Sequence, residues 1–210
     1  MRRAWEEASR VGFDYYLWLN DDTRLVAGAI HVLLATAAQL YQRHGRAAIV
    51  AGATRDEQTG EPTFGGKWMK DDSLIEPRDE PLPCDAINGN IALIPQQVFE
   101  LVGNLSQDFT HAIGDHDYSL RAAAQGVPVY LAPGYLGFCS PTAGSSWTLR
   151  EVSLRRRWQV LHSPKGLPPQ EYSEFLRRHM PRKRLWKLLK LYARVVFPSV
   201  WVGKQKGQVP

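Results

Sequence analysis

Residues 14–23 read DYYLWLNDDT, an almost continuous apolar and aromatic run that stops at four polar residues. Such a run predicts a strand buried on both faces of a mainly parallel sheet. Asn20, Asp21 and Asp22 would then lie at the carboxyl end of that strand, where open α/β sheets bind their ligands. Two acidic side chains there can hold a hard divalent cation, which neutralises a diphosphate. The alternative is that Asp22 or Thr23 only caps the helix that follows.

Segments with helical spacing alternate with short apolar runs on both sides of this stretch, which favours an α/β layer fold. Residues 55–85 are rich in Pro, Gly and carboxylates and are expected to form a long loop, which in a compact domain is more often functional than idle. The predicted helices are 2–10, 30–44, 96–102 and 115–125, and the predicted strands are 14–19, 47–53, 88–95 and 127–131.

The composition indicates an ordinary globular chain. It has 210 residues, 44% of them apolar, which is enough for a substantial core. Its two cysteines, Cys84 and Cys139, exclude a disulfide-rich scaffold. The sequence contains no apolar run of about 18 residues, the length that a membrane span needs. The first ten residues, MRRAWEEASR, lack the apolar core of a signal peptide, so we expect a cytoplasmic location.

The net charge of +5 combines two unlike parts of the chain. Residues 1–149 hold 11 Lys and Arg against 18 Asp and Glu, whereas residues 150–210 hold 15 against 3. We therefore expect an α/β portion over 1–150 and a basic helical extension over 151–210. The acidic first part and the lack of a recognised binding motif argue against nucleic acid as a partner.

The basic extension contains an amphipathic helical pattern, in which apolar side chains recur on one face among many cations. Three interpretations remain open. Residues 182–197 lie on an anionic membrane surface, dock onto the acidic part of the chain, or form a solvated charged helix. The first would place the chain at the inner face of the cell membrane. The apolar positions are Leu185, Leu188, Leu189, Tyr192, Val195 and Val196, and the cations are Arg182, Lys183, Arg184, Lys187, Lys190 and Arg194.

A second acidic segment, GDHD at 114–117, opens a predicted helix. Residues two apart on a helix point about 200° away from each other, so its two aspartates cannot face one cleft alike. Asp117 has Arg121 one turn later as an ion-pair partner, which favours a scaffold role. Asp115 lies at the helix start, where the helix dipole favours the ionised form that a general base needs. Capping of the helix is the alternative for this segment.

Three motif blocks, taken in order, resemble the inverting family-2 glycosyltransferases of the GT-A fold. They are YLWLNDDT at 16–23, INGNIALIPQQVFELVG at 87–103, and GDHDYSLRAAAQG followed by VPVYLAPG at 114–134. The resemblance covers about residues 1–160 and implies a Rossmann-like mixed sheet flanked by helices. It also implies Mg²⁺ or Mn²⁺ as cofactor, a nucleotide-diphosphate sugar as donor, and a glycan or lipid-linked acceptor.

The resemblance assigns roles to particular residues. Asn20-Asp21-Asp22 matches the family's metal and diphosphate motif, with Asp22 as the direct metal ligand, Asp21 beside it and Asn20 at the donor. The family's acidic pair falls on Gly114-Asp115, which makes Asp115 the catalytic base. The other matched or supporting residues are Asn88, Gly89 and Asn90 at the donor sugar, Asp117 and Arg121 as scaffold, and Trp147, for which sugar stacking and a core or rim position both remain open.

Two departures from the family pattern bear on function. Cys139 lies where similar enzymes supply a histidine to the metal, and we expect a buried structural thiol there because Mg²⁺ and Mn²⁺ prefer oxygen. Only 19 residues precede Asn20, so we expect the chain to lack the nucleotide-binding first half of the family domain. The alternative function is a catalytically inactive fragment that acts as a membrane- or protein-binding module.

Overall fold

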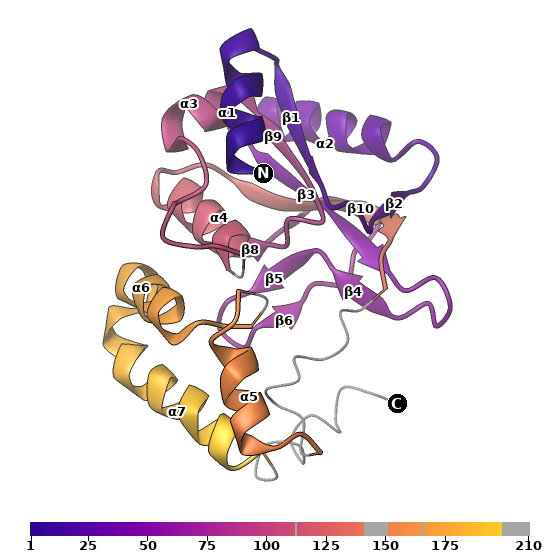
Figure 1. Ribbon diagram of the computed structural model, residues 1–210. Coiled ribbons are helices and arrows are strands. Elements are labelled where there is room, and N and C mark those ends of the chain that lie inside the picture. Colours follow the sequence, from indigo (N-terminus) through magenta and orange to yellow (C-terminus); the bar gives the residue numbers. More distant parts are fainter. Residues whose placement is uncertain (112, 141–150, 165, 199–210) are drawn as a thin grey trace. The chain divides into compact units, whose positions relative to one another are not determined.

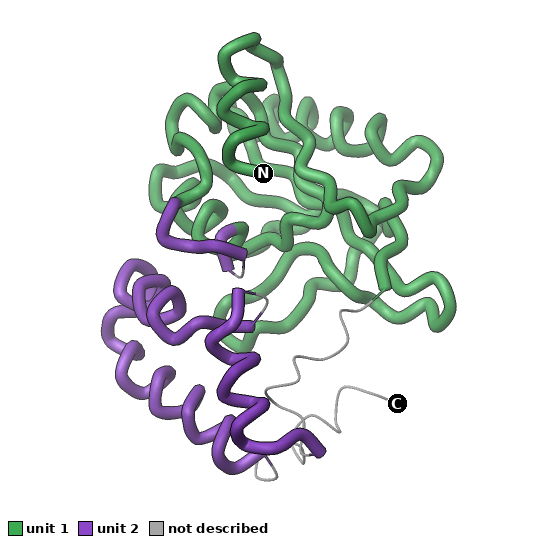
Figure 2. Tube along the Cα trace, viewed as in Figure 1, with its two compact units in different colours: residues 1–106, 115–141 green, residues 107–114, 142–210 purple. Residues whose placement is uncertain are grey.

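The chain divides into two compact units, which Figure 2 draws in different colours. The first comprises residues 1–106 and 115–141, and the second comprises residues 107–114 and 142–210. The computed structural model in Figure 1 describes residues 1–111, 113–140, 151–164 and 166–198.

The first unit is built on two β-sheets. Their strands are β1 (Tyr15–Leu19), β2 (Arg24–Leu25), β3 (Ile49–Arg55), β4 (Pro62–Phe64), β5 (Gly66–Trp68), β6 (Ser73–Leu74), β7 (Leu82–Pro83), β8 (Ala86–Ile87), β9 (Ile91–Pro95) and β10 (Val129–Phe138). The seven-stranded sheet has the order β1-β9-β3-β10-β2, with β4 paired to β3 and β7 paired to β10, and the smaller sheet has the order β6-β5-β8. The large sheet is mixed, because β3 and β10 run parallel while β1 and β9 run antiparallel.

Helices cover both faces of the seven-stranded sheet (Figure 1). They are α1 (Arg2–Val11), α2 (Ala29–His44), α3 (Gln96–Val102) and α4 (Gly114–Ala124), of which α4 has all but its first residue in the first unit. Val50 belongs to the core cluster that includes α2, whereas Ile49 and Ala51 belong to the cluster that includes α1, α3 and α4. Successive residues of β3 therefore point to opposite faces. The result is a three-layer α/β/α arrangement.

Strand β1 differs from its prediction. It forms an edge of the sheet and pairs antiparallel with β9 along its whole length. Tyr16 and Trp18 are buried, but Tyr15 and Leu19 are exposed. The expectation of a strand buried on both faces of a mainly parallel sheet is therefore wrong. The physical reason is unequal cover. The ring of Trp5 from α1 lies 5.8 Å from the Tyr16 ring and 5.1 Å from the Trp18 ring, whereas on the opposite face Leu17 is only partly buried and Tyr15 and Leu19 are exposed.

The predicted helices and strands elsewhere in the first unit are present, with two differences. Strand β10 continues to Phe138 instead of ending at Leu131, and its register against β3 shifts between Leu131 and Tyr135. Gly134, with φ of 66°, lies in that irregular part, which is why the apolar pattern breaks off early. The stretch 55–85 contains β4 to β7 and is not a plain loop.

The second unit is helical. It contains α5 (Leu154–Leu161), α6 (Pro169–His179), the short 3₁₀ helix η1 (Pro181–Lys183) and α7 (Arg184–Val196). Leu161, Leu191 and Val195 form a buried cluster, with Leu167 and Tyr172 packed against it. Across the described ranges, every helix is too short or too polar to span a bilayer.

Residues 107–114, which end at the first residue of α4, belong to the second unit. Thr110 Oγ1 donates a hydrogen bond to Glu171 Oε1 at 2.7 Å, and the rings of Phe109 and Phe175 lie 6.4 Å apart. The local sequence pattern does not indicate this attachment, because Thr110 and Glu171 are 61 residues apart.

Candidate functional site

The polar turn after β1 is held against the start of β9. The backbone N–H of Asn20 donates to the carbonyl of Asn90 at 3.2 Å, so the β1–β9 ladder continues one residue into the turn. Strand β2, which follows the turn, pairs with the end of β10. These two pairings place Asp22 and Thr23 beside Cys139, the residue directly after β10.

Asp22 does not cap the following helix. Helix α2 begins at Ala29, its N-cap residue is Gly28, and no side chain caps it. The capping alternative for Asp22 and Thr23 is therefore wrong. Asp22 is exposed, and its Oδ1 lies 3.7 Å from Cys139 Sγ, within reach of the weak S–H donor.

Cys139 and Asn90 form the inner side of this turn. Asn90 is buried, and its Nδ2 donates to Thr23 Oγ1 at 3.3 Å and to Cys139 Sγ at 3.4 Å. Cys139 is 3% exposed, which confirms the expectation of a buried thiol. Burial raises the pKa of the Cys139 thiol, and the charge of Asp22 raises it further. The group is therefore a neutral thiol at neutral pH rather than a thiolate ligand.

Asp115 is joined to the segment that precedes Asn90. The backbone N–H of Gly89 donates to Asp115 Oδ2 at 2.8 Å, and the N–H of His116 donates to Asp115 Oδ1 at 2.8 Å. Asp115 thus accepts one hydrogen bond from the first turn of α4 and one from Gly89 outside the helix. A residue that only caps the helix would accept the first bond alone. Asn88 completes the contact, since its Nδ2 lies 3.4 Å from the Nε2 of His116.

Asn88, Gly89 and Asn90 therefore connect the two acidic segments that the sequence singles out. Gly89 binds Asp115, while the neighbouring Asn90 binds Thr23 and Cys139 beside Asp22. A Cβ on Gly89 would lie 3.5 Å from Asp115 Cβ, an ordinary van der Waals contact. The glycine lies close to Asp115 but leaves room for a methyl group.

Asp117 has the different environment that helical geometry predicts. Its side chain is fully buried and forms an ion pair with Arg121, with Nε 2.8 Å from Oδ2. Arg121 also donates to the carbonyls of Val102 at 2.9 Å and Asn104 at 3.0 Å. The predicted i,i+4 pair is confirmed, and it ties α4 to the residues that end and follow α3.

The donor set of the turn fits a hard cation shared with a substrate. Asp21 and Asp22 are both exposed and offer carboxylate oxygens. The described residues include no group of three or more His, Cys, Asp or Glu side chains that could hold a metal by themselves. Mg²⁺ commonly binds through one or two carboxylates together with substrate phosphates and water, which this turn can accommodate.

Three observations qualify the set of residues that the sequence singles out. Trp147 lies outside the described residues. Thr23 and His116 take part in the hydrogen-bond network, although the family resemblance assigns a role to neither of them. Their positions next to Asp22 and Asp115 are the only signal that could have indicated them.

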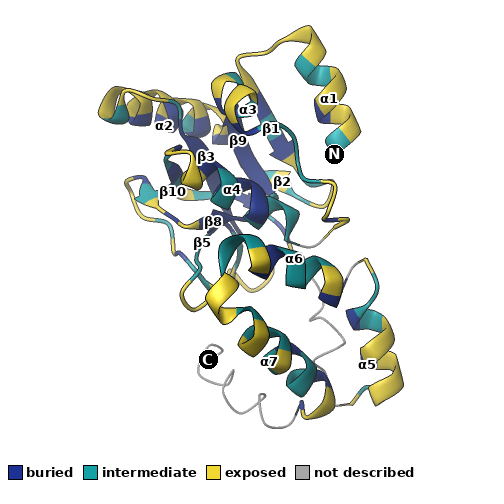
Figure 3. Ribbon diagram, turned by 90° about the vertical axis from the view of Figure 1, so that its left-hand side faces the viewer, coloured by how far each residue is buried: buried dark blue, intermediate teal, exposed yellow. Residues whose placement is uncertain are grey.

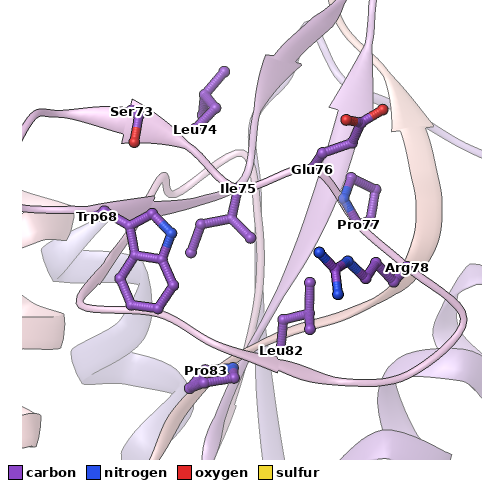
Figure 4. Close-up of a pocket in the computed structure, with 9 residues that line it drawn as sticks. All are labelled: Trp68, Ser73, Leu74, Ile75, Glu76, Pro77, Arg78, Leu82 and Pro83. Atoms are coloured by element: carbon purple, nitrogen blue, oxygen red, sulfur yellow. The ribbon is translucent and has the colours of Figure 1, made fainter.

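A separate hollow of about 590 Å³ lies elsewhere in the first unit (Figure 4). Trp68 of β5, Ile75 and Leu82 supply apolar surface, and Glu76 and Arg78 carry its charges. None of the residues that the sequence predicts for the site lines it. The hollow and the acidic turn are therefore distinct features.

A scan against protein-family models finds no match for this chain, and a search of curated proteins finds none that is similar. The features of this chain that bear on its function are therefore its motifs and the contacts between them.

Proposed function

We propose that this chain is an inverting, metal-assisted glycosyltransferase similar to family 2, built on a GT-A-like sheet. It would move a sugar from a nucleotide-diphosphate donor to a hydroxyl of a glycan or lipid-linked acceptor. The observation that supports this most is the link through residues 88–90. It brings the acidic turn at Asp22 and the aspartate at 115 onto one three-residue segment.

In the proposed reaction, Asp115 is the general base. An acceptor hydroxyl attacks the anomeric carbon, a new carbon–oxygen bond forms, the bond to the diphosphate breaks, and Asp115 takes the hydroxyl proton. The hydrogen bonds from Gly89 and His116 fix the orientation of the Asp115 carboxylate while each oxygen keeps a lone pair for the proton.

In this proposal, Asp22 and Asp21 bind the cation that contacts the leaving diphosphate. Mg²⁺ or Mn²⁺ bound there would neutralise charge that develops on the departing nucleoside diphosphate. Asn20 contacts the donor, and Asn88, Gly89 and Asn90 line the donor sugar. Cys139 orients Asp22 through its S–H group and does not bind the metal.

The second candidate is a membrane-binding module without transfer activity. The exposed apolar side chains of α7 favour it, with Leu185, Trp186 and Leu189 at 77%, 68% and 64% exposure. The two candidates are distinguished by binding of a sugar nucleotide and by transfer activity.

The test measures metal-dependent donor hydrolysis and transfer over a panel of sugar nucleotides, together with nucleotide binding by calorimetry. Asp115→Asn should lower kcat by about 10²–10⁴-fold and leave donor affinity unchanged. Asp22→Asn should weaken nucleotide binding in the presence of Mn²⁺ more than in its absence. Asp79→Asn, at an exposed carboxylate to which the proposal assigns no role, is the matched control.

Wild-type activity in both Asp115→Asn and Asp22→Asn would refute the assigned roles. A chain that neither turns over nor binds any sugar nucleotide would refute the transferase and leave the module as the function.

A further inference from the structure

Helix α7 carries apolar residues that pack in the core of its own unit and others that are exposed. Leu191 and Val195 are buried in the cluster around Leu161. Leu185 and Leu189 are exposed. The sequence pattern places Leu185, Leu189 and Val195 on a single face, and the structure buries one edge of that face at Val195 and exposes the other at Leu185 and Leu189.

The exposed apolar residues lie on neighbouring parts of the helix and directly after it. At 100° per residue, Leu185, Leu189 and Val196 fall within about 40° of one another, Trp186 lies about 60° beyond Leu189, and Phe197 follows the last residue of α7. All five are at least 43% exposed. Figure 3 shows exposed positions recurring along α7. We call these five residues the outer face of α7.

Isolated exposed apolar residues are common on proteins, but a grouped strip on one helix indicates a binding surface. A solvated charged helix would present polar side chains outward. The outward side chains here are Leu, Trp, Val and Phe, which disfavours that interpretation.

Charge next to the strip is of one sign. The sequence from 175 to 210 contains ten Lys and Arg and no Asp or Glu. Arg182 and Lys183, just before α7, are exposed. Lys190 and Arg194 fall beside the outer face on the same helical projection. An apolar strip bordered by cations is complementary to the interface of an anionic bilayer.

We propose that the outer face of α7 binds the surface of an anionic lipid bilayer, with the helix lying in the interface. The 13 residues of α7 extend about 20 Å, less than the roughly 30 Å hydrocarbon core, so the helix lies on the membrane and does not cross it. Trp186 is suited to the headgroup region, since its indole has an apolar body and a polar N–H. This inference does not depend on transferase activity.

The test is flotation of the full chain with vesicles of phosphatidylcholine containing 30% phosphatidylglycerol, in about 0.1 M salt. Leu185→Gln/Leu189→Gln should lower the bound fraction at least tenfold, because each buried leucine contributes substantially to partitioning. Arg182→Gln/Lys183→Gln should lower binding about tenfold or more, because each cation near such a surface is worth roughly 1 kcal/mol, a factor of about five. Leu101→Gln, an equally apolar change at a 53% exposed position of α3, should leave binding unchanged.

A second measurement follows the tryptophan itself. Brominated lipids should quench part of the protein fluorescence, and Trp186→Phe should abolish that quenching while flotation persists. If the chain binds pure phosphatidylcholine vesicles as well as it binds the anionic vesicles, the electrostatic part of the proposal is overturned. No flotation with anionic vesicles, or loss of binding in Leu101→Gln as large as in the leucine pair, would overturn the proposal as a whole. Transfer to a soluble acceptor is measured separately, so failure of the proposed function is distinguishable from failure of this one.

Discussion

The ion pair that anchors α4 gives the sharpest test of the structure. The Asp117 side chain is fully buried, and Arg121, 24% exposed, places its Nε 2.8 Å from the carboxylate. Arg121→Met keeps most of the aliphatic stem but leaves a buried carboxylate without this partner. It also removes the hydrogen bonds to the carbonyls of Val102 and Asn104. Breaking a buried pair in this way costs about 3–5 kcal/mol, so we expect the free energy of unfolding to fall by that amount.

The assay is urea denaturation at pH 7, followed by circular dichroism. Asp117→Asn should cost less, about 1–2 kcal/mol, because Arg121 keeps two carbonyl acceptors and partial access to water. The double variant should be more stable than Arg121→Met alone, because it removes the buried charge whose ion pair with Arg121 is lost. A loss below about 1 kcal/mol for Arg121→Met, or an equal loss for Asp117→Asn, would refute the reasoning.

Three further predictions concern the buried Trp5, the ion pair of Glu174 in α6 and the two thiols. Trp5→Ala should lower the free energy of unfolding by about 3–5 kcal/mol and Trp5→Phe by clearly less, since Trp5 is 4% exposed; equal losses in urea denaturation would contradict the packing role. Hydrogen bonding from Arg177 lowers the pKa of Glu174 to about 2, so the carboxylate stabilises the fold above its unfolded pKa near 4.5 and loses that effect as the pH falls to about 2. Glu174→Gln should therefore lower the Tm at pH 7 but not at pH 2, and a difference that persists at pH 2 would count against it. Burial raises the pKa of Cys84 to about 12 and also raises that of Cys139, so iodoacetamide at pH 8 should label both only in urea; rapid labelling of the folded chain would show that they are accessible.

The sequence predicts most elements of the first unit because their apolar periods are local. It fails at β1, where Tyr15 and Leu19 look as buried as Tyr16 and Trp18. Which neighbour a strand pairs with, and on which side, depends on residues far along the chain. Here the distant partner is β9, and the face that is buried is the one that Trp5 of α1 covers at Tyr16 and Trp18.

In the candidate site, too, contacts between residues close in sequence are predictable and contacts between distant residues are not. The contrast between Asp115 and Asp117 follows from the helical period and a partner four residues away, so it was predictable. The contact between Asp22 and Cys139 spans 117 residues and exists only because β2 pairs with the end of β10. A motif by itself could indicate that Cys139 is near the proposed metal site, but not that its thiol donates toward Asp22.

The antiparallel pairing of β1 with β9 limits how far the acidic turn and residues 88–90 can shift relative to each other. Because Asn20 follows β1 directly and Asn90 precedes β9 directly, the distance between the acidic turn and residues 88–90 is set by strand register. A slip of one residue would turn every β1 side chain to the opposite face and move Asp22 away from Cys139. Tyr16 and Trp18, which pack against Trp5, therefore fix the register of β1 as well as stabilising this edge strand. They keep the two acidic segments in alignment, so loss of Trp18 should impair the site before it unfolds the chain.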